Sequence, residues 1–261
     1  MLSYRIEGDN GPYLLLIHGW GVSFSIWQNL GRLLTPHYRL VMAELPGFGA
    51  SPWIPLDAPY AELCAGAIQE LRRSLKIERW SVLAYSSGTR AAESYMRIDS
   101  AHVSRAVFLC SAYLHLPNYL GLWLLDRLDR VLPSVTDWML TGWRIAPMIA
   151  LYGFNGRHRI HSREWTREIN RQPTIALKEA LREVFVMGRR SFDIGDTPTL
   201  FIWAKRDRAF TKPRDARGTH RSIDTMHSAP LLAAPLVAEA VLAHLDDHLQ
   251  SCQPTPAAKV G

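Results

Sequence analysis

Four short, continuously apolar runs in the first 112 residues limit the possible folds most strongly. They read YLLLIHG (13–19), YRLVMAEL (38–45), RWSVLAY (79–85) and SRAVFLCSA (104–112). Strands that are apolar at every position are typical of a parallel sheet with helices on both faces. Apolar residues at helical spacing over 59–76, and a second helix expected over 87–98, connect these runs. The series therefore predicts a mostly parallel, doubly wound α/β sheet.

The second half of the chain interrupts this alternation and then resumes it. A stretch rich in Trp, Tyr, Leu and Arg favours helices, which four prolines divide: Pro117, Pro133, Pro147 and Pro173. After it, TPTLFIWAKRD (197–207) predicts another buried strand, and PLVAEAVLAHLDDHL (235–249) predicts an amphipathic helix. The expected division is a core of residues 1–112 and 191–250, a helical insertion of residues 113–190, and a disordered tail of residues 251–261.

Composition narrows the class of protein. With 261 residues, of which 48% are hydrophobic, the chain can bury one large core. The three cysteines show no metal-ligand spacing, so we expect neither a disulfide framework nor a metal site. No apolar run approaches the roughly 18 residues of a membrane span, and the N-terminus lacks a signal-peptide layout. We therefore expect a cytoplasmic protein. The net charge of +6 comes with no nucleic-acid-binding motif, so a nucleic-acid partner is not expected.

A candidate nucleophile lies where the third apolar run meets a helix. The pattern of a nucleophile elbow is small, any, nucleophile, any, small, because the turn is sharp. Ser86 fits this pattern, with Ala84 and Gly88 at the small positions. Centring the pattern on Ser87 would place the bulky Tyr85 at a small position, so we assign the hydroxyl to Ser86.

A serine nucleophile needs a base, and the base needs an acid that orients it. Asp207 follows the late strand, and His227 lies in the loop before the last helix. Taken singly, Asp207 suits a helix cap or an ion pair with Arg206 or Arg208, and His227 suits a solvated loop. Their joint occurrence in the order Ser, Asp, His favours a catalytic triad.

The turn after the first apolar run completes the expected site. His18-Gly19-Trp20-Gly21 lets the backbone turn so that an N–H points at a developing oxyanion. We expect the backbone amides of Trp20 and Ser87 to form this oxyanion hole, and His18 to have a structural role. For substrate contact we nominate Trp20, Tyr85 and Trp143, although most aromatic residues of the insertion suit its own core.

Together these motifs resemble the α/β-hydrolase family. HGWG, PGFG, the serine turn and the Asp207 to His227 order follow the family's sequence over most of the chain. The resemblance implies the α/β-hydrolase fold, with the insertion as a helical cap over the site. Within the family, HGWG and PGFG look closest to esterases that demethylate a carrier-bound dicarboxylate ester in biotin synthesis. Ala84 in the serine turn and Met226 before the histidine depart from that group's pattern, which leaves the substrate open.

Basic residues gather where a carrier protein would approach. We nominate four arginines of the insertion for carrier binding: Arg144, Arg157, Arg159 and Arg163. A second basic group follows Asp207. Such a rim would attract an acidic acyl carrier protein. The alternative is a solvated helix face, because Glu164 and Glu168 are spaced to pair with arginines three residues on.

These features predict a serine hydrolase that cleaves a carboxylic ester through an acyl-enzyme, without a metal or organic cofactor. A small-molecule ester and a carrier-bound ester both suit the site. A broad short-acyl carboxylesterase, a C–C bond hydrolase and an aminopeptidase are alternatives within the same fold, because the triad does not select the leaving group. A non-catalytic ligand-binding protein is a further alternative, against which the complete set of triad residues argues.

Overall fold

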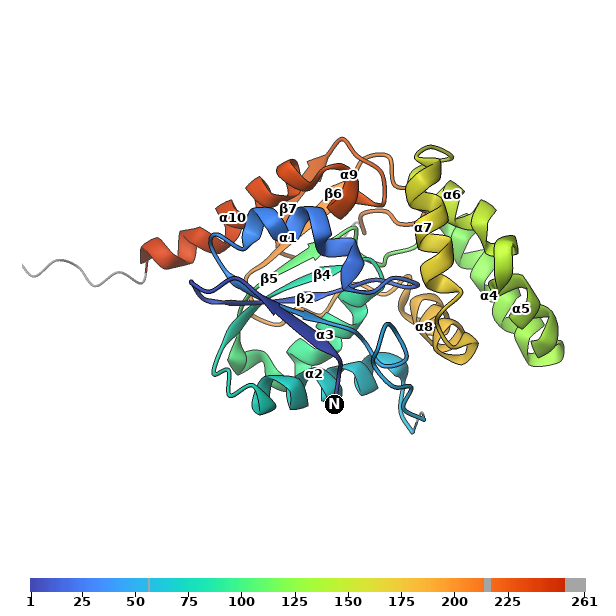
Figure 1. The fold of residues 1–261 in the computed structure, drawn as a ribbon, viewed down its shortest axis with the longest axis horizontal. Coiled ribbons are helices and arrows are strands. Elements are labelled where there is room, and N and C mark those ends of the chain that lie inside the picture. Colours follow the sequence, from blue (N-terminus) through green and yellow to red (C-terminus); the bar gives the residue numbers. More distant parts are fainter. Residues whose placement is uncertain (56, 214–216, 252–261) are drawn as a thin grey trace, which may run out of the picture.

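A single sheet forms the centre of the molecule in the computed structural model, which describes residues 1–55, 57–213 and 217–251 (Figure 1). In this described part the strand order is β1-β3-β2-β4-β5-β6-β7. Only β1 runs antiparallel to its neighbour. The strands are β1 (Tyr4–Glu7), β2 (Tyr13–Ile17), β3 (Arg39–Ala43), β4 (Trp80–Tyr85), β5 (Val103–Leu109), β6 (Thr199–Ala204) and β7 (Thr219–Ile223). The predicted mostly parallel, doubly wound sheet is confirmed.

Helices cover both faces of this sheet. On one face α1 (Gln28–Leu34) packs against α10 (Ala234–Ser251), and on the other α2 (Tyr60–Ser74) packs against α3 (Gly88–Asp99) (Figure 1). The central strands are buried on both sides, which explains their unbroken apolar sequences. Shorter helical elements are η1 (Phe24–Trp27), η2 (Ser100–His102) and α9 (Ala229–Leu232).

The two edge strands were not among the predicted runs. Their sequences are YRIE in β1 and THRSI in β7, and both are largely exposed. An edge strand has a neighbour on one side only, so it needs no continuous apolar sequence. Pairing with β3 and β6, rather than local pattern, therefore defines these strands.

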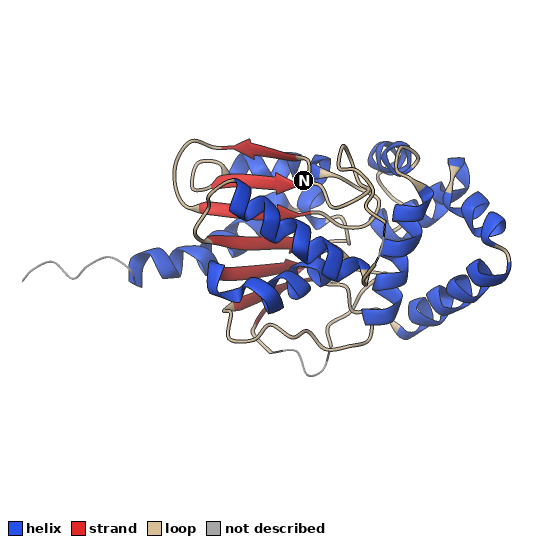
Figure 2. Cartoon of the chain, turned by 90° about the horizontal axis from the view of Figure 1, so that it is seen from below, coloured by secondary structure: helices blue, strands red, loops and turns tan. Residues whose placement is uncertain are grey.

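The stretch between β5 and β6 is helical in the described residues. It contains α4 (Leu116–Val131), α5 (Pro133–Leu140), η3 (Gly142–Ile145), α6 (Ala146–Phe154), α7 (Arg159–Ile169) and α8 (Thr174–Met187). Each of the four prolines lies at a helix start, where its missing N–H costs nothing. The helices lie beyond the end to which the parallel strands point (Figure 2). Of the tail predicted to be disordered, all residues except Ser251 lie outside the described part.

Candidate active site

The turn from β4 into α3 holds Ser86 in a rare backbone conformation. Its φ is +56°, in the left-handed region, and its N–H donates to the carbonyl of Leu109 at 2.9 Å. A Cβ atom at position 88 would lie 2.2 Å from the His18 carbonyl oxygen. The turn therefore requires glycine at Gly88, and it lifts the Ser86 side chain out of the strand.

The structure brings Ser86, Asp207 and His227 together. The Ser86 Oγ lies 2.9 Å from His227 Nε2, and His227 Nδ1 lies 2.7 Å from Asp207 Oδ2. The other Asp207 oxygen accepts the backbone N–H groups of Ala209 at 2.7 Å and Phe210 at 3.1 Å. Because the carboxylate can only accept, Nδ1 carries the proton, and Nε2 is free to accept the serine proton. The arrangement can therefore activate the serine hydroxyl.

Tyr85 holds the histidine loop rather than facing a cavity. Its side chain is fully buried, its hydroxyl donates to the His227 carbonyl at 3.1 Å, and the two rings lie 5.2 Å apart. The next residue, Ser228, donates both its N–H and its hydroxyl to the Gly153 carbonyl in α6. The histidine loop is thus tied to β4 on one side and to the insertion on the other.

The turn after β2 approaches the serine closely. A Cβ atom at Gly19 would lie 2.7 Å from the Ser86 Cβ, so the backbone passes directly beside the candidate nucleophile. Within the described part of the chain, the backbone N–H groups of Trp20 and Ser87 have no hydrogen-bond partner. Two unpaired amides beside a nucleophile can stabilise an oxyanion.

His18 fixes this turn and stays neutral. Its Nε2 accepts the backbone N–H of Leu45 at 2.9 Å, so its Nδ1 carries the proton and donates to the Gly19 carbonyl at 2.8 Å. The side chain is fully buried, and burial lowers the pKa of His18 to about 4. This geometry agrees with the expected structural role.

A narrow cavity lies beside the unpaired amides. Gly19, Trp20 and Ser87 are among the residues that line it. Its walls are mostly apolar and come from both the core and α8: Leu45, Phe48, Tyr60, Ala61, Ala91, Ala180 and Val184. Arg90 and Glu183 add charge, and burial raises the pKa of Glu183. The Trp20 indole N–H donates to the Leu177 carbonyl at 2.8 Å, which anchors this aromatic wall to α8.

The other nominated residues lie on the surface of the insertion. Trp143, in η3, is 61% exposed. Arg144 donates from Nε to the Trp138 carbonyl at 2.6 Å, and its guanidinium lies over the Trp138 ring. Three further arginines are exposed: Arg157, Arg159 and Arg163. Of these, Arg157 lines a surface hollow that reaches Asp207.

Three potential metal ligands also meet at this site. Ligand atoms of Cys110, Asp207 and His227 lie within 4.8 Å of one another. Burial raises the pKa of the Cys110 thiol well above its usual value, and Asp207 adds to the rise. A protonated thiol is a poor ligand, and His227 and Asp207 already bind each other. The group is therefore better suited to proton transfer than to metal binding.

The fold and the site define the class of protein. A family model described as alpha/beta hydrolase fold matches residues 12–218, so the chain belongs to the α/β-hydrolase family. It is a hydrolase of this fold. Among the described residues, no helix has the length and apolarity needed to cross a membrane.

Similarity to curated proteins is local. One relative is the pimeloyl-[acyl-carrier protein] methyl ester esterase of Vibrio vulnificus, 36% identical over 74 residues, or 28% of this chain and 25% of the relative. The protein of the same name from Aeromonas salmonicida is 50% identical over 42 residues, or 16% of each chain. The chain thus matches a quarter or less of the length of these relatives.

A longer match is to a hydrolase of another name. The 2-hydroxy-6-oxononadienedioate/2-hydroxy-6-oxononatrienedioate hydrolase 2 of Pseudomonas putida is 25% identical over 224 residues, or 79% of this chain and 75% of the relative. Among solved structures, a hydrolase from Oleispira antarctica superposes with a TM-score of 0.72 at 14% identity, covering 94% of each chain. That likeness supports the fold.

Proposed function

We propose that the protein is a serine carboxylesterase with Ser86 as nucleophile, His227 as general base and Asp207 as the group that orients the histidine. The observation that carries the proposal is the continuous hydrogen-bond chain through these three side chains, 2.9 Å and 2.7 Å long at its two links. The strained backbone of Ser86 supports it, since such conformations gather at functional sites.

The proposed reaction has two halves. The Ser86 Oγ attacks the ester carbonyl while His227 Nε2 takes its proton, and the amides of Trp20 and Ser87 hold the oxyanion. The C–O bond to the alcohol then breaks, and His227 returns the proton to the leaving oxygen. Water, deprotonated by the same histidine, then attacks the acyl-enzyme. The bond from the acyl carbon to Ser86 Oγ breaks, His227 returns the proton to Oγ, and the acid leaves. Asp207 stays ionised and stabilises the imidazolium.

For the substrate we propose a methyl ester at the end of an acyl chain that an acidic carrier protein holds. Local similarity to the pimeloyl-[acyl-carrier protein] methyl ester esterases supports this choice. The exposed arginines Arg157, Arg159 and Arg163 would attract the carrier. We further propose that residues 113–190 act as a cap, because α8 closes one wall of the cavity beside Ser87. The alternative substrate for the same site is a small-molecule ester that no carrier protein holds.

Replacing the nucleophile tests the enzyme assignment. Ser86→Ala should reduce hydrolysis of p-nitrophenyl acetate by at least ~10⁴-fold, because the remaining site supplies binding and an oxyanion hole only. It should also abolish covalent labelling by a fluorophosphonate. Ser87→Ala is the matched control, since it keeps the backbone N–H and should retain labelling. Equal activity in the wild type and Ser86→Ala would refute the proposed nucleophile.

A salt-dependent rate comparison tests the carrier. The methyl ester should be cleaved faster on an acyl carrier protein than as the free methyl ester, and this advantage should fall as ionic strength rises. Arg157→Glu, Arg159→Glu and Arg163→Glu together should remove the advantage and leave the free ester unaffected. Arg73→Glu, at an exposed position of α2, is the control. If Arg73→Glu lost the faster cleavage of the carrier-bound ester and the triple arginine variant kept it, the assignment of carrier binding to the three arginines would be contradicted.

C–C bond hydrolysis is a second candidate. Of the relatives described above, the Pseudomonas putida hydrolase aligns over the greatest length. An assay with a 2-hydroxy-6-oxo dienoate, followed through loss of its ultraviolet absorbance, separates the two reactions. Faster turnover of the dienoate than of carboxylic esters would favour C–C bond hydrolysis over the esterase proposal. Faster turnover of the esters would support the esterase proposal.

A further inference from the structure

Helix α4 is unusual because none of its apolar side chains is fully buried. Of its sixteen residues, only Asp126 is buried. Five apolar side chains are 44–75% exposed: Leu116, Leu120, Trp123, Leu124 and Val131. At about 100° per residue they fall within one sector of about 100°, so they form a single apolar stripe that faces outward.

Helix α5 continues this apolar surface. It packs against α4, and Val135, Trp138 and Met139 are exposed on it at positions i, i+3 and i+4. We call α4 and α5 the arm, and the exposed apolar residues of both helices the arm face. The arm lies at the end of the insertion farthest from the sheet (Figures 1 and 2). An outlying apolar surface of this kind marks an interaction site.

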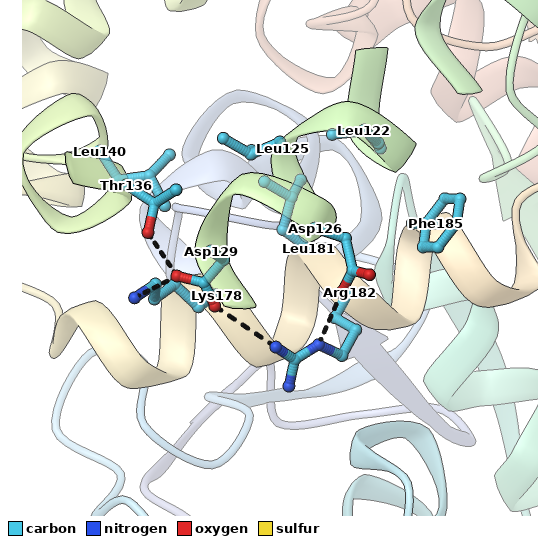
Figure 3. A pocket seen from close by; sticks show the side chains of 10 residues that line it. All are labelled: Leu122, Leu125, Asp126, Asp129, Thr136, Leu140, Lys178, Leu181, Arg182 and Phe185. Atoms are coloured by element: carbon cyan, nitrogen blue, oxygen red, sulfur yellow. Dashed lines mark hydrogen bonds and ion pairs between the residues drawn. The ribbon is translucent and has the colours of Figure 1, made fainter. Parts of the chain in front are cut away.

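The opposite side of the arm is firmly attached to α8. Lys178 binds Asp129 at 2.5 Å and Asp137 at 2.7 Å, and Arg182 binds Asp126 at 3.1 Å. Figure 3 shows Lys178 paired with Asp129, and Arg182 paired with Asp126 and Asp129, between α4 and α8. The hydrogen bonds from Lys178 and Thr136 outweigh burial and lower the pKa of Asp129. The arm face is therefore presented outward on a fixed support.

Arginines accompany the tryptophans of the arm face. The Arg127 guanidinium lies 5.8 Å from the centre of the Trp123 ring, and the Arg144 guanidinium lies 4.5 Å from that of Trp138. Arg127 lies in the same sector of α4 as the apolar stripe. Three acidic side chains of the arm pair with Lys178 or Arg182 of α8 instead: Asp126, Asp129 and Asp137. Each exposed tryptophan of the arm thus has an arginine beside it.

We propose that the arm face docks the protein on an anionic membrane surface. Tryptophans at the level of the lipid headgroups, aliphatic side chains below them and arginines against lipid phosphates are the features of interfacial helices. The arm binds from outside the site, so this inference does not depend on the esterase proposal.

Vesicle binding tests the inference. The full chain is mixed with vesicles of phosphatidylcholine, with or without phosphatidylglycerol, and sedimented. Phosphatidylglycerol should strengthen binding by about tenfold or more, because two arginines meet anionic lipid. Leu120→Gln with Leu124→Gln should weaken binding by ~10-fold or more, since two apolar contacts are lost. Arg127→Glu should weaken the preference for phosphatidylglycerol by about fivefold or more.

Controls separate the membrane from other partners. Ile98→Gln with Leu236→Gln changes equally exposed residues of α3 and α10 and should leave vesicle binding intact. No binding to phosphatidylglycerol vesicles overturns the inference. The inference is also overturned if, without lipid, the protein dimerises or binds an acyl carrier protein and only the Leu120→Gln with Leu124→Gln variant loses that interaction. Each variant should hydrolyse p-nitrophenyl acetate like the wild type; vesicle binding without any hydrolysis would refute only the esterase proposal.

Discussion

Helices α3 and α4 both follow strands of the central sheet, yet they are held in opposite ways. Ten of the twelve residues of α3 are buried, including Arg90 and Glu93, whereas α4 buries Asp126 alone. Close packing fixes α3 and therefore the turn that carries Ser86. Ion pairs to α8 and a half-buried contact of Tyr119 with Phe185 fix α4, and one apolar stripe of the helix stays exposed. The candidate catalytic geometry thus belongs to the core, and the insertion is the part that can vary.

Glycine substitutions should give the largest difference between the two helices. Gly88→Ala places a Cβ 2.2 Å from a backbone oxygen, so we expect a loss of roughly 1–3 kcal/mol in the free energy of unfolding. Ester hydrolysis should fall by at least ~100-fold, since the shift displaces Ser86. Urea unfolding and a p-nitrophenyl acetate assay measure these effects.

Gly121→Ala in α4 is the matched control for this change. A Cβ at position 121 would meet nothing within 4 Å, so alanine should stabilise the helix by up to ~1 kcal/mol and leave hydrolysis unaffected. Equal responses at positions 88 and 121 would remove the distinction between the two helices.

Acid should destabilise the core before it loosens the arm. Burial lowers the pKa of His18 from its ordinary value of 6.5 to about 4, so only the unfolded chain binds a proton at this residue between these pH values. The free energy of unfolding should therefore fall by roughly 3 kcal/mol as the pH drops from 6.5 to 4. The lowered pKa of Asp129 acts below this window, because its ion pairs persist until the pH falls below 3.8, the ordinary pKa of an aspartate.

Urea unfolding across this pH range measures the effect. His18→Asn should flatten the slope between pH 6.5 and 4, whereas Asp129→Asn should leave that slope in place. A wild-type stability that does not change over this interval would show that His18 can be protonated in the folded protein.

A smaller effect is expected from weakening the attachment of the arm. Lys178→Met removes two ion pairs of α4 and α5, so the amides of these helices should exchange hydrogen about fivefold faster, a cost of ~1 kcal/mol. Amides of α3 should keep their rates. Lys212→Met, at an exposed position, is the control. Faster exchange throughout the sheet would mean that the arm and the core unfold as one unit.

The sequence predicted the buried parts of the fold better than the edges. Runs such as Leu14–Ile17 are apolar at each position because helices cover both faces of the sheet. Such a strand can be recognised from its own consecutive residues. The strands β1 and β7 depend on pairing with distant neighbours and have no such pattern. Helix α1, also not predicted, is only seven residues long.

The order of Ser86, Asp207 and His227 along the chain was sufficient to nominate the candidate site. The contact from the Tyr85 hydroxyl to the His227 backbone spans 142 residues, and no local motif announces it. The outward face of α4 was hidden for a related reason: its leucines and tryptophan match the composition of a helix core, and only three-dimensional packing shows which neighbours are absent. Sequence patterns nominated the candidate triad residues, whereas contacts showed which groups support them.

The double hydrogen bond from Ser228 to the Gly153 carbonyl has a consequence for protein engineering. It fastens the residue after His227 to the insertion through a backbone atom, and a Cβ at position 153 would lie 3.0 Å from the Trp165 ring. An insertion transplanted from another hydrolase would have to present a carbonyl at the same place, or the histidine loop would lose this anchor. Domain exchange in this scaffold should therefore keep residues 153 and 228 as a pair.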